Sequence, residues 1–136
     1  MRLERITNTT DKVIPYLKRQ PFVEKIIFPF DEDFAQYELA KRQMKGACGL
    51  LTFILKAKKI ETIERFCESL RHILMAVSWG GHESLILPRC SGVPKEKFNA
   101  AVEEHRMFRL YVGLEDADYI INDLQHAFDS VAFLEK

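Results

Sequence analysis

The chain has 136 residues, of which 47% are apolar and 29% charged, and this composition is that of one ordinary soluble domain. Twenty lysine and arginine residues balance twenty aspartate and glutamate residues, so the net charge gives no reason to expect nucleic acid or another polyanion as a partner. No apolar run reaches the roughly 18 residues of a membrane span, and no apolar segment follows a basic N-terminus. We therefore expect residues 1–136 to form a single cytoplasmic domain that binds neither nucleic acid nor membrane.

The first 46 residues predict a helix, a strand and a second helix. Pro21 blocks helix continuation, so the first helix should end near Arg19. Its apolar residues recur at helical spacing: Leu3, Ile6, Val13, Ile14 and Leu17. Residues 22–28 (FVEKIIF) are rich in β-branched and aromatic side chains and predict a strand. Residues 31–45 are acidic at their start and basic at their end, which matches a helix dipole, and Gly46 should stop that helix.

The middle of the chain predicts two strands with helices on either side of the second. Residues 50–55 (LLTFIL) are apolar on both faces, which a strand tolerates when it is covered on both sides, so we place them in the middle of a sheet. The next apolar stripe has helical spacing and is interpreted as core: Ile63, Phe66, Cys67, Leu70 and Leu74. Residues 84–87 predict a short strand ended by Pro88, and Pro94 suits the first turn of a short helix to about Glu104.

The last predicted strand carries a single arginine, Arg109. Side chains alternate along a strand, so its residues divide into two faces: Phe108, Leu110 and Val112 on one, and Met107, Arg109 and Tyr111 on the other. Gly113 ends the strand, and the acidic residues that follow begin a helix over about 115–128. An arginine in such a strand must form an ion pair with an acidic side chain, be exposed on the outer face, or bind an anionic ligand.

The predicted elements follow the order helix, strand, helix, strand, helix, strand, short helix, strand, helix. Four strands with helices packed on them indicate an α/β (α+β) two-layer fold. Connections of mixed length favour a largely antiparallel sheet. No linker or internal repeat divides the chain.

Motifs of catalytic chemistry are sparse. Gly80-Gly81 is too short for a phosphate-binding glycine loop. The four histidines share no metal-ligand spacing with one another or with the three cysteines, so we expect no metal. Serine and histidine lie close together in residues 78–84 without defining a hydrolase triad. Arg89 could lower the pKa of the neighbouring Cys90 thiol, but an ordinary loop cysteine is the favoured interpretation.

Three segments, in order, closely resemble one enzyme family. They are residues 41–55 (KRQMKGACGLLTFIL), 78–87 (SWGGHESLIL) and 109–124 (RLYVGLEDADYIINDL). They are similar to the C-terminal domain of the Cys/Met-metabolism pyridoxal-phosphate (PLP) enzymes, which include cystathionine γ-synthase, cystathionine β-lyase and methionine γ-lyase. The resemblance runs from the first helix to about Phe128 and implies the small C-terminal domain of a fold-type I PLP enzyme.

This resemblance implies three substrate-binding residues. The arginine of the family's Arg-Leu-x-Val-Gly-x-Glu-Asp motif binds the α-carboxylate of the amino-acid substrate, and it corresponds to Arg109. Ser78 corresponds to a serine beside that carboxylate. Trp79 looks like the Ser-Trp-Gly-Gly form of bacterial cystathionine β-lyases, which implies a lyase. Glu83 and Ser84 match the rest of the motif and are interpreted as structural residues that hold the turn against the sheet.

Two points remain open at this level. The alternative to a carboxylate site at Arg109 is a salt bridge to Glu83 or Asp116. Residues 88–94 (PRCSGVP) also differ from the family's longer segment, which lies near the distal end of the substrate and carries a proline and a threonine or serine followed by histidine. The choice among β-elimination, γ-elimination and γ-replacement therefore stays open.

The cofactor machinery of the family has no counterpart here. In the family a larger domain binds PLP and supplies the Schiff-base lysine, and no lysine of this chain stands in a similar context. We expect the chain alone to hold no PLP and no catalytic residue, and to require that domain, in cis or in trans, to act on a sulfur-containing amino acid. The alternative is a non-catalytic α/β interaction or oligomerisation module left by a truncated or split gene. An apolar surface without its cover would favour a homo-oligomer.

Overall fold

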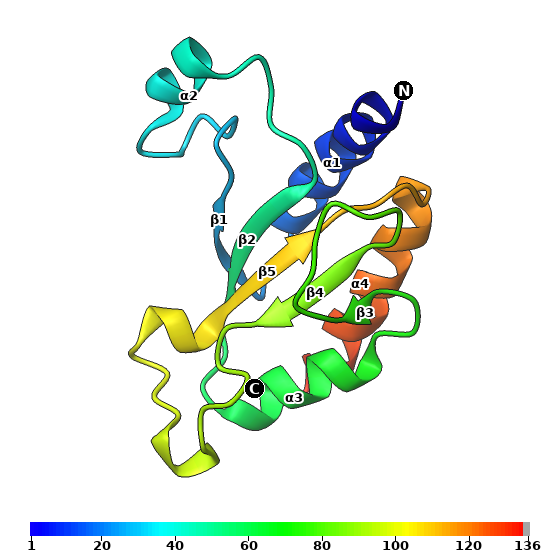
Figure 1. Ribbon diagram of the computed structural model, residues 1–136. Coiled ribbons are helices and arrows are strands. Elements are labelled where there is room, and N and C mark those ends of the chain that lie inside the picture. The colour runs from blue at the N-terminus through cyan, green and yellow to red at the C-terminus, as the bar shows by residue number, and fades with distance from the viewer. Residues whose placement is uncertain (135–136) are drawn as a thin grey trace.

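The computed structural model describes residues 1–134, which form a five-stranded sheet with helices packed on one face (Figure 1). The elements in chain order are α1 (Arg2–Lys18), β1 (Val23–Ile27), α2 (Tyr37–Gln43), β2 (Leu50–Leu55), α3 (Ile60–Ser69), β3 (Leu74–Met75), β4 (Leu85–Pro88), the 3-10 helices η1 (Lys95–Lys97) and η2 (Glu103–Arg106), β5 (Met107–Tyr111) and α4 (Ala117–Val131). The predicted α/β architecture is confirmed. None of the helices in residues 1–134 is both long and apolar enough to cross a membrane.

The sheet has the order β1-β2-β5-β4-β3. The pairs β1–β2, β2–β5 and β5–β4 are antiparallel, and β3 pairs with β4 in parallel. The sheet is thus largely antiparallel, as predicted. The prediction of four strands is wrong, because β3 adds a fifth. The prediction that residues 50–55 are the middle strand is also wrong: β5 is central, and Leu50 in β2 is 37% exposed.

The sequence did not predict β3, because the apolar pattern with helical spacing that begins at Ile63 was extended too far, to Leu74. The α3 helix ends at Ser69, and a carboxylate from α4 binds the backbone of the residues that follow. The buried Asp123 accepts hydrogen bonds from the backbone N–H groups of Arg71, His72 and Ile73 at 2.8, 2.9 and 2.8 Å. These three bonds turn the chain out of α3 and lead it into β3, and they join residues that are 50 to 52 positions apart in the sequence.

Two other predicted helices are shorter than expected. The acidic start of residues 31–45 forms a turn instead of a helix, and α2 begins only at Tyr37. In that turn the buried Asp31 accepts hydrogen bonds from Lys18 Nζ at 2.6 Å and from the Asp33 N–H at 3.1 Å, so its carboxylate is engaged outside any helix. The helix predicted from Pro94 is replaced by two short 3-10 turns, η1 and η2.

The core lies between the helices and one face of the sheet. Phe108 of β5 stacks on Phe53 of β2, with ring centroids 5.1 Å apart and planes 2° from parallel. Phe66 of α3 meets Phe108 edge-on at 5.2 Å, and it meets Phe128 of α4 in the same way at 5.0 Å. The two predicted faces of residues 107–112 are confirmed, because Phe108, Leu110 and Val112 are all fully buried in this core. Figure 1 shows α1 and α4 behind the strands, which leaves the opposite face of β2, β5 and β4 in front.

Candidate functional site

Arg109 lies on the face of the sheet that the helices do not cover. Its β5 position pairs with Thr52 of β2 on one side and Leu87 of β4 on the other. The guanidinium Nη2 donates a hydrogen bond to the backbone carbonyl of Val77. Within residues 1–134, Arg109 makes no salt bridge, because Glu83 lies against His82 and Asp116 pairs with Arg5 at 2.7 Å. The salt bridge considered as the alternative is therefore not formed.

A cleft of about 320 Å³ opens beside Arg109. Thr52, Leu87 and Met107 form its floor on the three central strands, and Arg89 and Ser91 contribute from the segment that follows β4. The lining contains two guanidinium groups, two hydroxyl groups and no carboxylate among the described residues. Such a cleft offers hydrogen-bond donors and positive charge to an anion.

The other two predicted site residues stand in the loop between β3 and β4. Ser78 is exposed and directly follows Val77, the residue whose carbonyl receives the Arg109 hydrogen bond. Trp79 is 61% exposed and lines a different cavity of about 410 Å³, together with Leu3, Leu50 and Tyr111. Ser78 is therefore next in sequence to a contact of Arg109 but does not line the Arg109 cleft, and Trp79 lies beside the start of α1.

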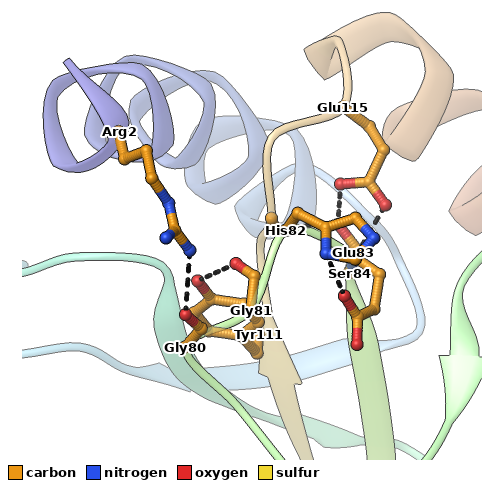
Figure 2. A network of polar contacts seen from close by, with 9 residues as sticks. Arg2, Gly80, Gly81, His82, Glu83, Ser84, Tyr111 and Glu115 are labelled. Atoms are coloured by element: carbon orange, nitrogen blue, oxygen red, sulfur yellow. Dashed lines mark hydrogen bonds and ion pairs between the residues drawn. The ribbon is translucent and has the colours of Figure 1, made fainter.

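A polar network fixes the end of this loop (Figure 2). The Glu115 carboxylate accepts hydrogen bonds from the Ser84 N–H at 2.7 Å and from Ser84 Oγ at 2.8 Å, and Ser84 Oγ in turn accepts one from the Gly113 N–H at 2.9 Å. The carbonyl of His82 accepts from the Leu114 N–H at 2.7 Å. The start of β4 is thus tied to the connection between β5 and α4, which supports the structural role expected for Ser84.

Two further contacts in Figure 2 hold the two glycines of the loop. The Tyr111 hydroxyl donates to the Gly81 carbonyl at 3.0 Å, and Arg2 donates to the Gly80 carbonyl at 3.3 Å. Gly80 has φ +88°, a conformation that side chains other than glycine rarely adopt. The Glu83 carboxylate lies 3.0 Å from His82 Nδ1 within the turn.

Glu115 is the site-supporting residue that the sequence did not reveal. Its sequence position indicated only negative charge at the start of a helix. The signal that could have exposed it is the adjacent Gly113: a Cβ there would lie 2.3 Å from the His82 carbonyl oxygen. Only glycine permits the two segments to approach so closely, and that approach places Ser84 within reach of Glu115.

Two of the three cysteines, Cys67 and Cys90, have raised thiol pKa values. Burial raises the pKa of the Cys67 thiol to about 12, and the nearby Cys90 adds to this effect. Burial also raises the pKa of the Cys90 thiol, so the lowering that Arg89 could have produced is not found. The described part of the chain holds no cluster of three or more His, Cys, Asp or Glu side chains that could ligate a metal ion.

Comparison with known proteins places the chain in a family. The family model described as "Cys/Met metabolism PLP-dependent enzyme" matches residues 1–129. The chain belongs to this family. It is 36% identical to the L-methionine gamma-lyase of Treponema denticola, over 96% of this chain and 33% of that protein. It is 37% identical to the cystathionine gamma-lyase of Sus scrofa, over 93% of this chain and 32% of that protein.

Solved structures of Cys/Met-metabolism enzymes share the fold. The crystal structure of cystathionine gamma synthase from Xanthomonas oryzae pv. oryzae, in complex with aminoacrylate and cysteine, matches with a TM-score of 0.84 and 26% identity. The match covers 97% of this chain and 35% of that one. Cystathionine gamma-lyase from Lactobacillus plantarum, complexed with L-serine, matches with a TM-score of 0.80 and 32% identity, over 96% and 35%. The chain spans about a third of the length of these relatives.

The described residues do not fit the covalent site that PLP requires. A Schiff-base lysine needs a lowered pKa, and no lysine of residues 1–134 lines the Arg109 cleft. Hydrogen bonds to carboxylates raise the pKa of three lysines: Lys18 beside Asp31, Lys41 beside Glu38, and Lys95 beside Glu64. The Arg109 cleft, in contrast, offers hydrogen-bond donors and positive charge.

Proposed function

We propose that this chain is the C-terminal, substrate-carboxylate-binding domain of a PLP-dependent lyase or transferase of sulfur amino acids. The observation that carries the proposal is the position of Arg109, whose guanidinium faces an anion-accepting cleft without a carboxylate partner among the described residues. A planar guanidinium forms two parallel hydrogen bonds with a carboxylate, which fixes both the position and the orientation of the bound group.

The surrounding residues prepare Arg109 for this role. The Val77 carbonyl holds the guanidinium in place while no ligand is bound, and a carboxylate replaces that neutral acceptor with a charged one. The Ser84–Glu115 bonds keep the loop that carries Val77 and Ser78 at a fixed position over the sheet. Ser78 then offers its hydroxyl to the same carboxylate. Holding the ligand in one geometry is the contribution that this domain makes to rate.

A cytoplasmic cystathionine β-lyase-like enzyme is the form of this proposal that the loop favours, because Ser78-Trp79-Gly80-Gly81 resembles the bacterial β-lyase motif. No lysine of residues 1–134 lines the cleft, so by this proposal the chain has no activity alone and needs the large PLP-binding domain in cis or in trans. Incubation of the chain with PLP is expected to give no stoichiometric visible absorbance band. A specific band of that kind would contradict this part of the proposal.

The carboxylate role of Arg109 is tested directly by titration. The chain is titrated with butyrate at low ionic strength, and the arginine side-chain and backbone amide signals are followed by NMR. Saturable shifts around Arg109 are expected in the wild type and their loss in Arg109→Gln. Arg71→Gln is the matched control, because Arg71 is exposed and lies outside the cleft. Equal binding by wild type and Arg109→Gln would show that the role assigned to Arg109 is wrong.

The second candidate is a non-catalytic interaction or oligomerisation module. It is favoured by apolar side chains exposed at the edge of the sheet. Leu74 and Met75 of the edge strand β3 are 56% and 62% exposed, and Val77, which follows the strand, is 73% exposed. An edge strand with exposed apolar side chains is a surface for pairing with another chain. Sedimentation equilibrium distinguishes the two: a stable dimer that Met75→Lys disrupts, without any butyrate binding, would favour this second candidate.

A further inference from the structure

Cys67 and Cys90 approach the space between α3 and the end of β4 from opposite sides. Cys67 lies one turn after Ile63 on α3, and Ile63 is 2% exposed, so this side of the helix faces the sheet. Pro88 of β4 pairs with Phe108, whose ring is in the core, and the pairing with β5 continues through the next residue. Because side chains alternate, Cys90 returns to the same covered face, where it is 5% exposed.

An ion pair and a tight turn hold the same two segments together. Lys95 Nζ lies 2.7 Å from Glu64 Oε2, and Glu64 stands one turn before Cys67 on α3. The Cys90 carbonyl accepts a hydrogen bond from the Val93 N–H at 2.8 Å, which closes the turn that follows β4. The segment that carries Cys90 is therefore anchored beside the part of α3 that carries Cys67.

Both thiols line one cavity of about 420 Å³. Its walls are mostly apolar, and they include Ile60, Ile63, Met75, Pro88, Val93 and Pro94. Burial raises the pKa of both thiols, and the nearby Cys90 contributes to the shift at Cys67. Both cysteines are free thiols in this structure. The arrangement thus places two thiols, from segments 23 positions apart in the sequence, around one space into which both sulfur atoms can move.

We propose that Cys67 and Cys90 form a reversible disulfide, which fixes the segment after β4 to α3 under oxidising conditions. The proposal does not depend on the carboxylate role of Arg109. Arg89 and Ser91 stand on either side of Cys90 in the sequence, and both line the Arg109 cleft. The disulfide therefore restrains one wall of that cleft, and it makes the mobility of this wall sensitive to the redox state.

The oxidant for this step is a peroxide, represented by hydrogen peroxide. Cys67 is half-buried and is the thiol that the oxidant reaches first. Its thiolate attacks a peroxide oxygen, the O–O bond breaks, and a sulfenic acid and water form. The Cys90 thiolate then attacks the Cys67 sulfur, the S–O bond breaks, and a second water leaves. Two thiols and one hydrogen peroxide thus give one disulfide and two water molecules.

The test oxidises the 136-residue chain with hydrogen peroxide at low protein concentration and about pH 9, where more of each thiol is ionised than at neutral pH. The wild type and Cys48→Ser are expected to lose two hydrogen atoms in mass, and peptide mapping should find Cys67 linked to Cys90. Cys67→Ser and Cys90→Ser should form no intramolecular link. Cys48 is the matched control, because it lines the separate cavity beside α1. Dithiothreitol should reverse the change.

Hydrogen exchange measures the restraint of the cleft wall. The N–H groups of Ser91 and Val93 donate to carbonyls within the turn at 3.0 and 2.8 Å, so their exchange reports the opening of that turn. Both should exchange about tenfold more slowly in the oxidised wild type than in the reduced one. The Leu114 N–H, which is hydrogen-bonded elsewhere in the fold, should exchange at the same rate in both forms.

Each other outcome overturns a defined part of the proposal. Thiols that stay free, a link that involves Cys48, dimers joined between chains, or sulfinic acid without a Cys67–Cys90 link would each overturn the disulfide. A Cys67–Cys90 link with unchanged exchange at Ser91 and Val93 would overturn the restraint. The peptide map of the wild type requires no substitution, so the decision does not depend on whether a variant folds.

Discussion

The two faces of the strands β2, β5 and β4 carry different kinds of side chain. On the face covered by helices, Phe53 and Phe108 are fully buried and stacked. On the open face, the neighbouring positions Thr52 and Arg109 are half-buried and line a cleft. Successive side chains of β5 thus point alternately into the core and toward the cleft. Single substitutions at adjacent positions should therefore affect stability and binding separately. The following experiments would break or sharpen this division.

The largest effect is expected from Phe108→Ala on the covered face. The substitution leaves a cavity among the rings of Phe53 and Phe66, and should lower the free energy of unfolding by about 3–5 kcal/mol in urea denaturation. Phe133→Ala is the control, because Phe133 is 61% exposed, and should change that free energy by less than about 0.5 kcal/mol. A loss below about 1 kcal/mol at Phe108 would mean that this face does not carry the core.

Asp123→Ala should have the next largest effect. The substitution removes the acceptor of three backbone N–H groups at the start of β3. Because these donors are left without a hydrogen-bond partner, the free energy of unfolding should fall by about 3 kcal/mol. The β3 amides should also lose hydrogen-exchange protection. Asp118→Ala, an exposed carboxylate on the same helix, should cost less than about 1 kcal/mol. Equal effects of the two variants would deny the capping role of Asp123.

A smaller effect is expected from the half-buried Cys67 at alkaline pH. Its pKa is about 12 in the folded chain, above the ordinary value of 9.0, so the unfolded chain releases this proton first. The stabilisation that comes from the protonated Cys67 thiol is therefore fully present below pH 9, and it is lost as the pH rises from 9 toward 12. The free energy of unfolding should fall by about 1 kcal/mol less in Cys67→Ser than in the wild type between pH 8 and pH 10. Parallel pH profiles for the two proteins would contradict this.

The smallest effect on stability is expected from Arg109→Gln on the open face. The side chain makes no ion pair within the described residues, so the free energy of unfolding should change by less than about 0.5 kcal/mol. Butyrate binding should nevertheless be lost. A destabilisation above about 2 kcal/mol would show that Arg109 supports the fold, and the two faces would then not be separable.

Local patterns in the sequence were sufficient for much of the fold. Strand alternation correctly placed Phe108, Leu110 and Val112 on the face of the main core, although Tyr111 on the other face is also buried, in a smaller cluster with Ile6 and Leu85. The prediction failed where a distant group intervened: Asp123 ends α3 and leads the chain into β3, and Lys18 helps to hold Asp31 out of α2. Spacing within a segment carries no information about a carboxylate more than 50 residues away, so helix ends were the least predictable features.

For the site, the motif at residues 109–116 marked Arg109 from the sequence alone, since its arginine sits in a run that otherwise reads as a buried strand. The tertiary structure decided what surrounds it. Only strand pairing placed Thr52 and Leu87 on either side of Arg109, carried Arg89 into the same cleft, and turned Trp79 toward another cavity. The physical reason is that alternation along one strand is a local property, whereas the neighbours of a side chain on a sheet depend on register between strands far apart in sequence.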